Sequence, residues 1–305
     1  MNRSLPPRAA ARRALLDWYG PRRAAYPWRA RRRDPYGVLV SEVMLQQTQA
    51  ARVAPAYSAF MQRFPTVEAL ASAGRGAVIR AWRGLGYNRR AVSLFEAARQ
   101  IVAEHEGKVP SDPDQLRRLP GAGPYTAAAV ASIAFDIPVA AVDTNVRRLI
   151  ARVFYGREAD ALSLHDARLV AGRWLDRRAP GAWNQALMDL GREVCRPLPR
   201  CDHCPLATHC AYRRRVSGPD ARPAHGRKRQ QVSTPFDGSF RQLRGRIVAA
   251  LRERETVTLR TLAGLTGRPL ADVAAAVKAL ARDGLVRASP AAVAGRPAAR
   301  VTLSV

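Results

Sequence analysis

One stretch of the chain, residues 119–145, restricts the possible folds more than any other. It reads LPGAGPYTAAAVASIAFDIPVAAVDTN, so a Gly-x-Gly turn at Gly121 and Gly123 leads into a helix of small residues. Such a turn lets the backbone approach a ligand closely, and the unpaired N–H groups of a helix start suit a phosphate. Asp143 follows some twenty residues later and opens the next helix. The stretch therefore predicts either a phosphate-binding turn with a functional carboxylate or a plain helical hairpin with an N-capping aspartate.

The charge of the chain favours a polyanionic partner. Its 305 residues include 51 Lys and Arg against 24 Asp and Glu, which gives a formal net charge of +27. Nucleic acid is the first class of partner that this predicts, and an anionic membrane surface is the second. No signal peptide is visible, and the most apolar window, residues 126–142, contains Asp136 and Pro138 and is too short to span a bilayer. We expect a cytoplasmic protein of two or three domains.

Helical periodicity dominates residues 1–214. Apolar residues recur at helical spacing, without sustained strand alternation, in three stretches: 53–61, 92–102 and 146–153. Residues 215–235 are polar, basic and contain proline, which predicts a linker.

The last part of the chain, residues 236–305, has a different pattern. Three helical stretches precede two alternating stretches that flank a Gly-Arg-Pro turn; they are 240–251, 259–265, 270–280, 285–288 and 299–303. This order predicts a small winged-helix-like α+β domain, a class that often binds DNA and often only contacts other proteins.

Two carboxylates have opposite electrostatic surroundings. Glu42 lies in the apolar helix YGVLVSEVML, where burial would raise its pKa and suit it to proton donation near neutral pH. The alternative is a solvent-facing glutamate on an amphipathic helix. Asp143 meets the positive end of a helix dipole, which favours the ionised form. One neutral acid and one anion form the pair that cleavage of a glycosidic bond needs.

All four cysteines fall within sixteen residues. Cys195, Cys201, Cys204 and Cys210 follow the spacing C-x5-C-x2-C-P-x4-C, which predicts a metal site rather than a disulfide framework. Zinc and a [4Fe–4S] cluster both accept four cysteines, so the spacing alone does not separate them.

Six motifs occur in one order along residues 15–212: SEVMLQQTQ, GLGYNRR, LPGAGPYTA, VDTNVRR, NQALMDLG and the cysteine loop. Together they resemble the MutY-type adenine DNA glycosylases of the endonuclease III superfamily. The resemblance implies an all-α, two-lobed helix-hairpin-helix fold, with a helical barrel near 30–135 and a cluster lobe built from 1–29 and 136–214. It also implies a [4Fe–4S] cluster, although this family usually has six residues between its first two cysteines and this chain has five.

The resemblance assigns roles to individual residues. Glu42 would handle protons at the adenine and Asp143 would stabilise the sugar cation, while Tyr125 and Asn145 would position Asp143 and the water. Tyr125 stands where bifunctional relatives carry a lysine, and tyrosine cannot form an imine, so we expect no strand cleavage. The remaining assignments are five DNA-binding residues, Gln47, Tyr87, Pro120, Gly121 and Gly123, and two residues of the base pocket, Arg29 and Asp189.

The resemblance predicts a monomeric, nucleoid-associated prokaryotic repair enzyme that acts on double-stranded DNA containing a mispair. It would hydrolyse the bond to adenine opposite 8-oxoguanine or guanine. Full-length relatives carry a MutT-like domain of well over a hundred residues, and the roughly seventy residues after Ser233 cannot hold that fold. Two alternatives therefore stay open: a mismatch glycosylase that removes thymine or uracil opposite guanine, and a non-catalytic DNA-binding protein.

Overall fold

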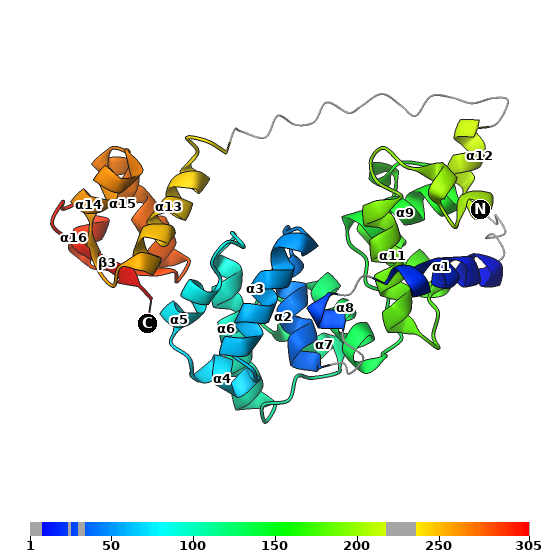
Figure 1. Cartoon of the computed structure of the whole chain (residues 1–305), viewed down its shortest axis with the longest axis horizontal. Coiled ribbons are helices and arrows are strands. Elements are labelled where there is room, and N and C mark those ends of the chain that lie inside the picture. The colour runs from blue at the N-terminus through cyan, green and yellow to red at the C-terminus, as the bar shows by residue number, and fades with distance from the viewer. Residues whose placement is uncertain (1–7, 24–25, 30–33, 218–235, 305) are drawn as a thin grey trace. The chain divides into compact units, whose positions relative to one another are not determined.

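The computed structural model describes residues 8–23, 26–29, 34–217 and 236–304, which are mostly helical, as the sequence predicts (Figure 1). The chain divides into two compact units. The first unit comprises Met1–Glu42, Pro110–Arg118 and Ala122–Arg227, and the second comprises Val43–Val109, Leu119–Gly121 and Lys228–Val305. Most of the expected linker, residues 218–235, lies outside the described residues. Within the described ranges, no helix is long and apolar enough to cross a membrane.

The described part of the first unit is helical throughout. Its α-helices are α1 (Arg8–Arg22), α2 (Pro35–Leu45, whose last turn enters the second unit), α7 (Pro113–Arg118), α8 (Pro124–Phe135), α9 (Thr144–Tyr155), α10 (Leu164–Trp174), α11 (Pro180–Glu193) and α12 (Ala211–Ser217). Short 3-10 helices complete it: η1 (Pro27–Arg29), η2 (Ala159–Ala161), η3 (Cys201–His203) and η4 (Ala207–His209).

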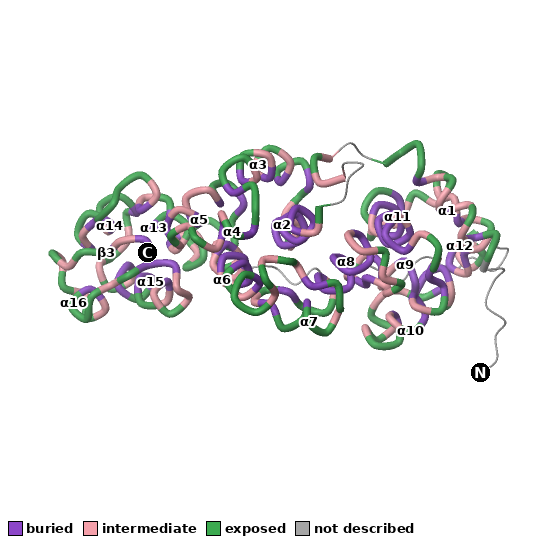
Figure 2. The backbone as a smooth tube through the Cα atoms, turned by 90° about the horizontal axis from the view of Figure 1, so that it is seen from below, coloured by how far each residue is buried: buried purple, intermediate pink, exposed green. Residues whose placement is uncertain are grey.

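Helix α11 is the centre of this unit's packing. Helix α1 presents Ala11, Leu15 and Tyr19 at successive turns to the same core, so the N-terminal segment packs on α11. Helices α8 and α11 are buried along most of their length (Figure 2). Two glycines allow this close packing. A Cβ on Gly181 would lie 2.7 Å from the Ser132 carbonyl oxygen, and a Cβ on Gly191 would lie 3.0 Å from the Asn145 Cβ.

The second unit contains four helices from the middle of the chain and a C-terminal domain. The four helices are α3 (Ala50–Arg63), α4 (Val67–Ser72), α5 (Arg75–Ala81) and α6 (Arg89–Glu104). Their core includes edge-on contacts of Phe60 with Phe64 and Trp82. The three stretches with helical apolar spacing all lie in helices, namely in α3, α6 and α9.

The C-terminal domain has the predicted winged-helix order. Its elements are α13 (Phe240–Glu253), β1 (Val257–Thr258), α14 (Leu259–Thr266), α15 (Leu270–Arg282), β2 (Val286–Ala288), α16 (Pro290–Val293) and β3 (Arg300–Leu303). The three strands form an antiparallel sheet in the order β1-β3-β2, with Val257 opposite Val301 and Val286 opposite Leu303. The sequence analysis missed β1 and α16, because a two-residue strand and a four-residue helix are too short to show periodicity.

Candidate active site

Glu42 lies on α2 with its carboxyl group turned into the protein. It is 5 % exposed, and its Oε2 atom has no hydrogen-bond partner. Burial raises the pKa of Glu42 to about 7, because desolvation outweighs hydrogen bonding with Tyr125 and the charge of Arg29, while the nearby Asp143 adds to the rise. A carboxyl group that has one unpartnered oxygen and a pKa of about 7 is suited to donate its proton to a ligand.

Asp143 is the N-cap of α9. Its Oδ1 accepts a hydrogen bond from the Val146 backbone N–H at 2.7 Å, and its Oδ2 accepts one from the Asn145 side chain at 2.8 Å. Both oxygens are therefore oriented by α9 itself. The side-chain amide of Asn145 is therefore in direct contact with Asp143.

Arg148 connects this aspartate to the cysteine loop, and the sequence analysis missed it. Its Nη2 donates to the Asn145 Oδ1 at 2.9 Å and to the Gly191 carbonyl at 2.8 Å, and its Nε donates to the Cys195 carbonyl at 2.8 Å. Arg148 thus holds Asn145 in the orientation that serves Asp143. The only signal in the sequence was its place three residues after Asn145, which puts both on one face of a helix.

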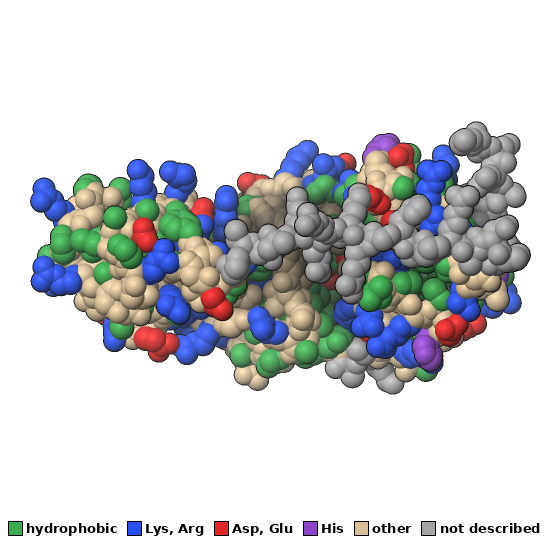
Figure 3. Space-filling model, turned by 90° about the horizontal axis from the view of Figure 1, so that it is seen from above, with side chains coloured by type: hydrophobic (Ala, Val, Ile, Leu, Met, Phe, Trp, Pro, Cys, Tyr) green, Lys and Arg blue, Asp and Glu red, His purple; other side chains and the backbone are tan. Residues whose placement is uncertain are grey.

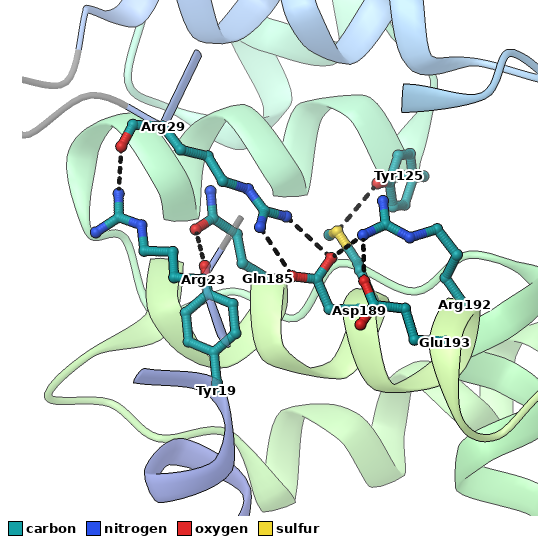
Figure 4. A network of polar contacts seen from close by, with 9 residues as sticks. Tyr19, Arg23, Arg29, Tyr125, Gln185, Asp189, Arg192 and Glu193 are labelled. Carbon is teal, nitrogen blue, oxygen red and sulfur yellow. Dashed lines mark hydrogen bonds and ion pairs between the residues drawn. The ribbon is translucent and has the colours of Figure 1, made fainter. Parts of the chain in front are cut away.

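Tyr125 stands in the first turn of α8, next to Glu42. Its hydroxyl donates to the Met188 Sδ at 3.3 Å (Figure 4). Burial and the carboxylates of Glu42 and Asp143 raise the pKa of Tyr125 well above its ordinary value, so the phenol stays neutral. A neutral phenol between two carboxyl groups can donate a hydrogen bond but cannot act as a base.

Arg29 and Asp189 form a buried bidentate ion pair (Figure 4). Arg29 Nη1 and Nη2 donate to the two Asp189 oxygens at 2.8 and 3.0 Å, and Arg192 donates to Oδ1 as well. The oxygens of Asp189 are therefore engaged by arginines. The Nε of Arg29 is buried without a partner.

The second unit brings the other predicted DNA-contacting residues together. Gln47 and Tyr87 both adopt a left-handed backbone, with φ of 56° and 44°, which is strained for residues other than glycine. Arg90 clamps both turns, because its Nη1 donates to the carbonyls of Val43, Met44 and Gln46 and its Nη2 to those of Leu85 and Gly86.

The glycine turn has one end in each unit, because Gly121 belongs to the second unit and Gly123 to the first. In the second unit, Gly121 has φ of 82°, a Cβ there would lie 2.8 Å from the Ser93 Cβ, and its carbonyl accepts from the Gln46 side chain at 3.2 Å. Pro120 is half-buried before it. In the first unit, Gly123 is the N-cap of α8 and provides no side-chain cap.

The four cysteines line one cavity in the first unit. Its walls also include Leu149, Leu206 and Arg152, whose Nη1 lies 3.8 Å from the Cys195 Sγ. Burial raises the pKa of the Cys204 thiol to about 12. Among the described residues, no three His, Cys, Asp or Glu side chains form a group that could hold a single metal ion.

Comparison with known proteins shows the superfamily and the fold of the chain. The model of the HhH-GPD superfamily base excision DNA repair proteins matches residues 40–168, which contain Glu42, Tyr125 and Asp143. Among solved structures, a thermostable thymine-DNA glycosylase is 30 % identical, with a TM-score of 0.62 over 68 % of this chain and 96 % of that one. An endonuclease III–DNA complex, 24 % identical with a TM-score of 0.57, shares the fold. Fold and site together define a DNA N-glycosylase of base excision repair.

Curated relatives identify the family to which the chain belongs within the DNA N-glycosylases. The chain is 41 % identical to the adenine DNA glycosylase of Mycolicibacterium smegmatis over 81 % of its length and 82 % of the relative. It is 42 % identical to that of Mycobacterium tuberculosis, with 82 % and 81 % covered, and 43 % identical to that of Homo sapiens, with 68 % and 40 % covered. The chain belongs to the adenine DNA glycosylase family.

Proposed function

We propose that this chain removes adenine that is mispaired with 8-oxoguanine or guanine in double-stranded DNA and leaves the strand uncut. The observation that carries the proposal is the pair formed by Glu42, a buried acid whose pKa is about 7 and whose Oε2 is unpartnered, and Asp143, an N-capping carboxylate. An extruded base can take a proton from the first, and a sugar cation is stabilised by the second.

The proposed reaction assigns one step to each group. Glu42 gives its proton to N7 of adenine, and the bond between N9 and C1′ breaks with its electron pair going to the base. Asp143 stabilises the positive charge on the sugar. Water adds to C1′ and returns a proton to Glu42, so free adenine and an abasic site are formed. The unpartnered Nε–H of Arg29 is available to hold the extruded base.

Tyr125 supports the absence of strand cleavage. A lyase step requires an amine that attacks C1′ and forms an imine, and a phenol cannot do so. Asn145 and the hydroxyl of Tyr125 are hydrogen-bonding groups beside the carboxylates, suited to orienting water. We also propose that the protein works as a monomer, because Glu42, Tyr125, Asp143 and Asn145 all come from a single chain. Its place of action is proposed to be the nucleoid in the cytoplasm.

Single-turnover excision tests the choice of base. Duplexes that pair adenine, thymine or uracil with 8-oxoguanine or guanine are incubated with excess protein, with and without alkali. We expect release of adenine only, opposite both purines, and strand breaks only after alkali. Faster release of thymine or uracil from pairs with guanine would contradict the proposal and support the alternative mismatch activity.

We propose that Cys195, Cys201, Cys204 and Cys210 hold a [4Fe–4S] cluster. A zinc ion needs all four sulfurs within about 2.3 Å of one point, whereas the four thiolates of a cluster bind different iron atoms and can stand further apart. The four cysteines line one cavity, which is compatible with the second arrangement. When bound, the cluster would cross-link the cysteine loop. The Cys195 carbonyl of this loop accepts a hydrogen bond from the Arg148 side chain.

The metal content gives a prediction that does not depend on activity. We expect the purified protein to contain about four iron atoms and four sulfides per chain, with broad visible absorbance. Cys204→Ser should lose most of both, because one iron atom loses its ligand. Thr208→Ala, an exposed change in the same loop, should keep them. One zinc per chain and no iron would show that the site is a zinc site.

A further inference from the structure

The C-terminal domain is fixed to the turn that carries Tyr87. Ile79 of α5 is fully buried in the hydrophobic core of this domain, and a Cβ on Gly76 would lie 2.9 Å from the Ser304 carbonyl oxygen. Arg252 of α13 donates to the Ile79 carbonyl at 3.0 Å and to the side chain of Asn88 at 2.9 Å. Because Asn88 directly follows Tyr87, these contacts hold α13 beside the Tyr87 turn.

A groove of about 790 Å³ lies between the two strained turns and α13. The Gln47 and Tyr87 turns form one wall, and Phe240, Arg241 and Arg244 belong to the other. Lys and Arg side chains are spread over the C-terminal domain in the space-filling view (Figure 3). The groove therefore joins residues that the sequence places almost two hundred positions apart.

The charge of this groove is strongly positive. Five arginines and one acidic residue, Asp283, line it. Arg244 pairs with Asp283, and Arg89 lies 3.8 Å from it. Among the described residues, no carboxylate pairs with Arg52 or Arg241, so two cations remain for an anionic ligand.

Exposed aromatic rings accompany these cations. Tyr87 is 48 % exposed and Phe240 47 %, and the Arg241 guanidinium lies 5.2 Å from the ring centre of the exposed Phe236. A basic groove with exposed aromatic rings is the combination that binds nucleic acid strands, because arginines contact phosphates and rings contact sugars or unstacked bases.

Helix α15 is the helix that usually contacts DNA bases in a winged-helix domain. Here it offers few side chains for such contacts. Helix α15 has the sequence LADVAAAVKALAR, and its exposed side chains are two alanines, Ala271 and Ala275, and two cations, Lys278 and Arg282. Alanine cannot donate or accept a hydrogen bond at a base edge. Helix α13 supplies the exposed ring of Phe240 and the unpaired Arg241 to the groove, so DNA contact is favoured at α13.

We propose that the groove between α13 and the Gln47 and Tyr87 turns binds a strand of the substrate duplex, so that the C-terminal domain forms part of the DNA-binding surface. This inference rests on the proposed function for the identity of the ligand as duplex DNA. The phosphates are contacted by Arg52 and Arg241, and Phe240 packs against the strand.

Equilibrium binding of the full chain to a mispaired duplex, measured at several salt concentrations, tests this. Arg241→Glu and Phe240→Ala should each weaken binding about 10-fold. Arg241→Glu should also reduce the slope of log K against log salt by about 1, because one phosphate contact is lost. Arg260→Ala removes an exposed cation from α14 outside the groove and should change neither value.

If Arg241→Glu binds DNA with the affinity and salt slope of the unmodified chain, the inference is overturned. An acidic protein would then be the favoured partner of the groove. The outcome is separable from the proposed function. If the chain excises adenine but Arg241→Glu binds DNA normally, only the groove assignment fails. If Arg241→Glu loses affinity while no adenine is released by the unmodified chain, the groove assignment stands and the proposed reaction fails.

Discussion

We expect that replacing Asp143 with asparagine stops adenine excision while DNA binding and folding persist. Asparagine keeps an oxygen that can accept from the Val146 N–H, so the N-cap of α9 survives the change. The negative charge beside the sugar cation is lost, and we expect the single-turnover rate to fall on the order of 10³-fold or more. Quenched-flow or manual excision assays on an adenine·8-oxoguanine duplex measure the rate.

A matched control variant distinguishes the loss of the Asp143 charge from the loss of a helix N-cap. Ser163 is the N-cap of α10 in the same unit and accepts from the Asp166 N–H. Ser163→Ala should lower stability by about 1 kcal/mol and leave the excision rate unchanged at saturating protein. An Asp143→Asn variant that excises adenine at nearly the unmodified rate would remove Asp143 from the mechanism.

Replacing Glu42 with glutamine has the second largest expected effect. Glutamine fills the same volume but cannot give up a proton, so we expect excision to slow by about 10²- to 10⁴-fold. In the unmodified chain, the rate should fall as the pH rises above about 7, because the acid form of Glu42 disappears. Glu104→Gln, an exposed change on α6, should alter neither the rate nor its pH profile. An unchanged rate in Glu42→Gln would assign proton donation to another group.

The same pKa predicts how stability depends on pH. The folded-state pKa of Glu42 is raised from 4.5 to about 7, so the folded state holds this proton more tightly than the unfolded state does. Its stabilising contribution is fully present below about pH 4.5 and is lost as the pH rises through 7. Relative to the unmodified chain, Glu42→Gln should therefore gain about 3 kcal/mol between pH 4.5 and pH 8. Denaturant unfolding at both pH values measures this, and parallel pH dependences would contradict it.

Local features of this protein could be predicted because their causes lie within a few residues. The spacing of apolar residues predicted the helices that became α3, α6, α9, α13, α14 and α15. Asp143 could be placed as an N-cap because an aspartate before a helical stretch has a defined local role. The resemblance carried by six short motifs led to the same family as the comparisons with known proteins.

Contacts between distant residues could not be predicted in the same way. Arg29 and Asp189 were both proposed for the base pocket, but the sequence does not reveal that they form a bidentate ion pair across 160 positions. Arg148 was overlooked because an arginine in a basic chain has no local signature. Its role appears only when α11 and the Cys195 carbonyl come within reach of its side chain.

The sequence by itself determined which groups are available: an acid in an apolar helix, an N-capping carboxylate, a tyrosine in place of a lysine, and four clustered cysteines. Only the tertiary structure decided that Glu42 is buried without a partner for Oε2, and that the C-terminal domain shares a basic groove with the Gln47 and Tyr87 turns. The reason is physical. A helix or a cap depends on neighbours along the chain, whereas desolvation and a groove depend on which surfaces, far apart in the sequence, exclude water together.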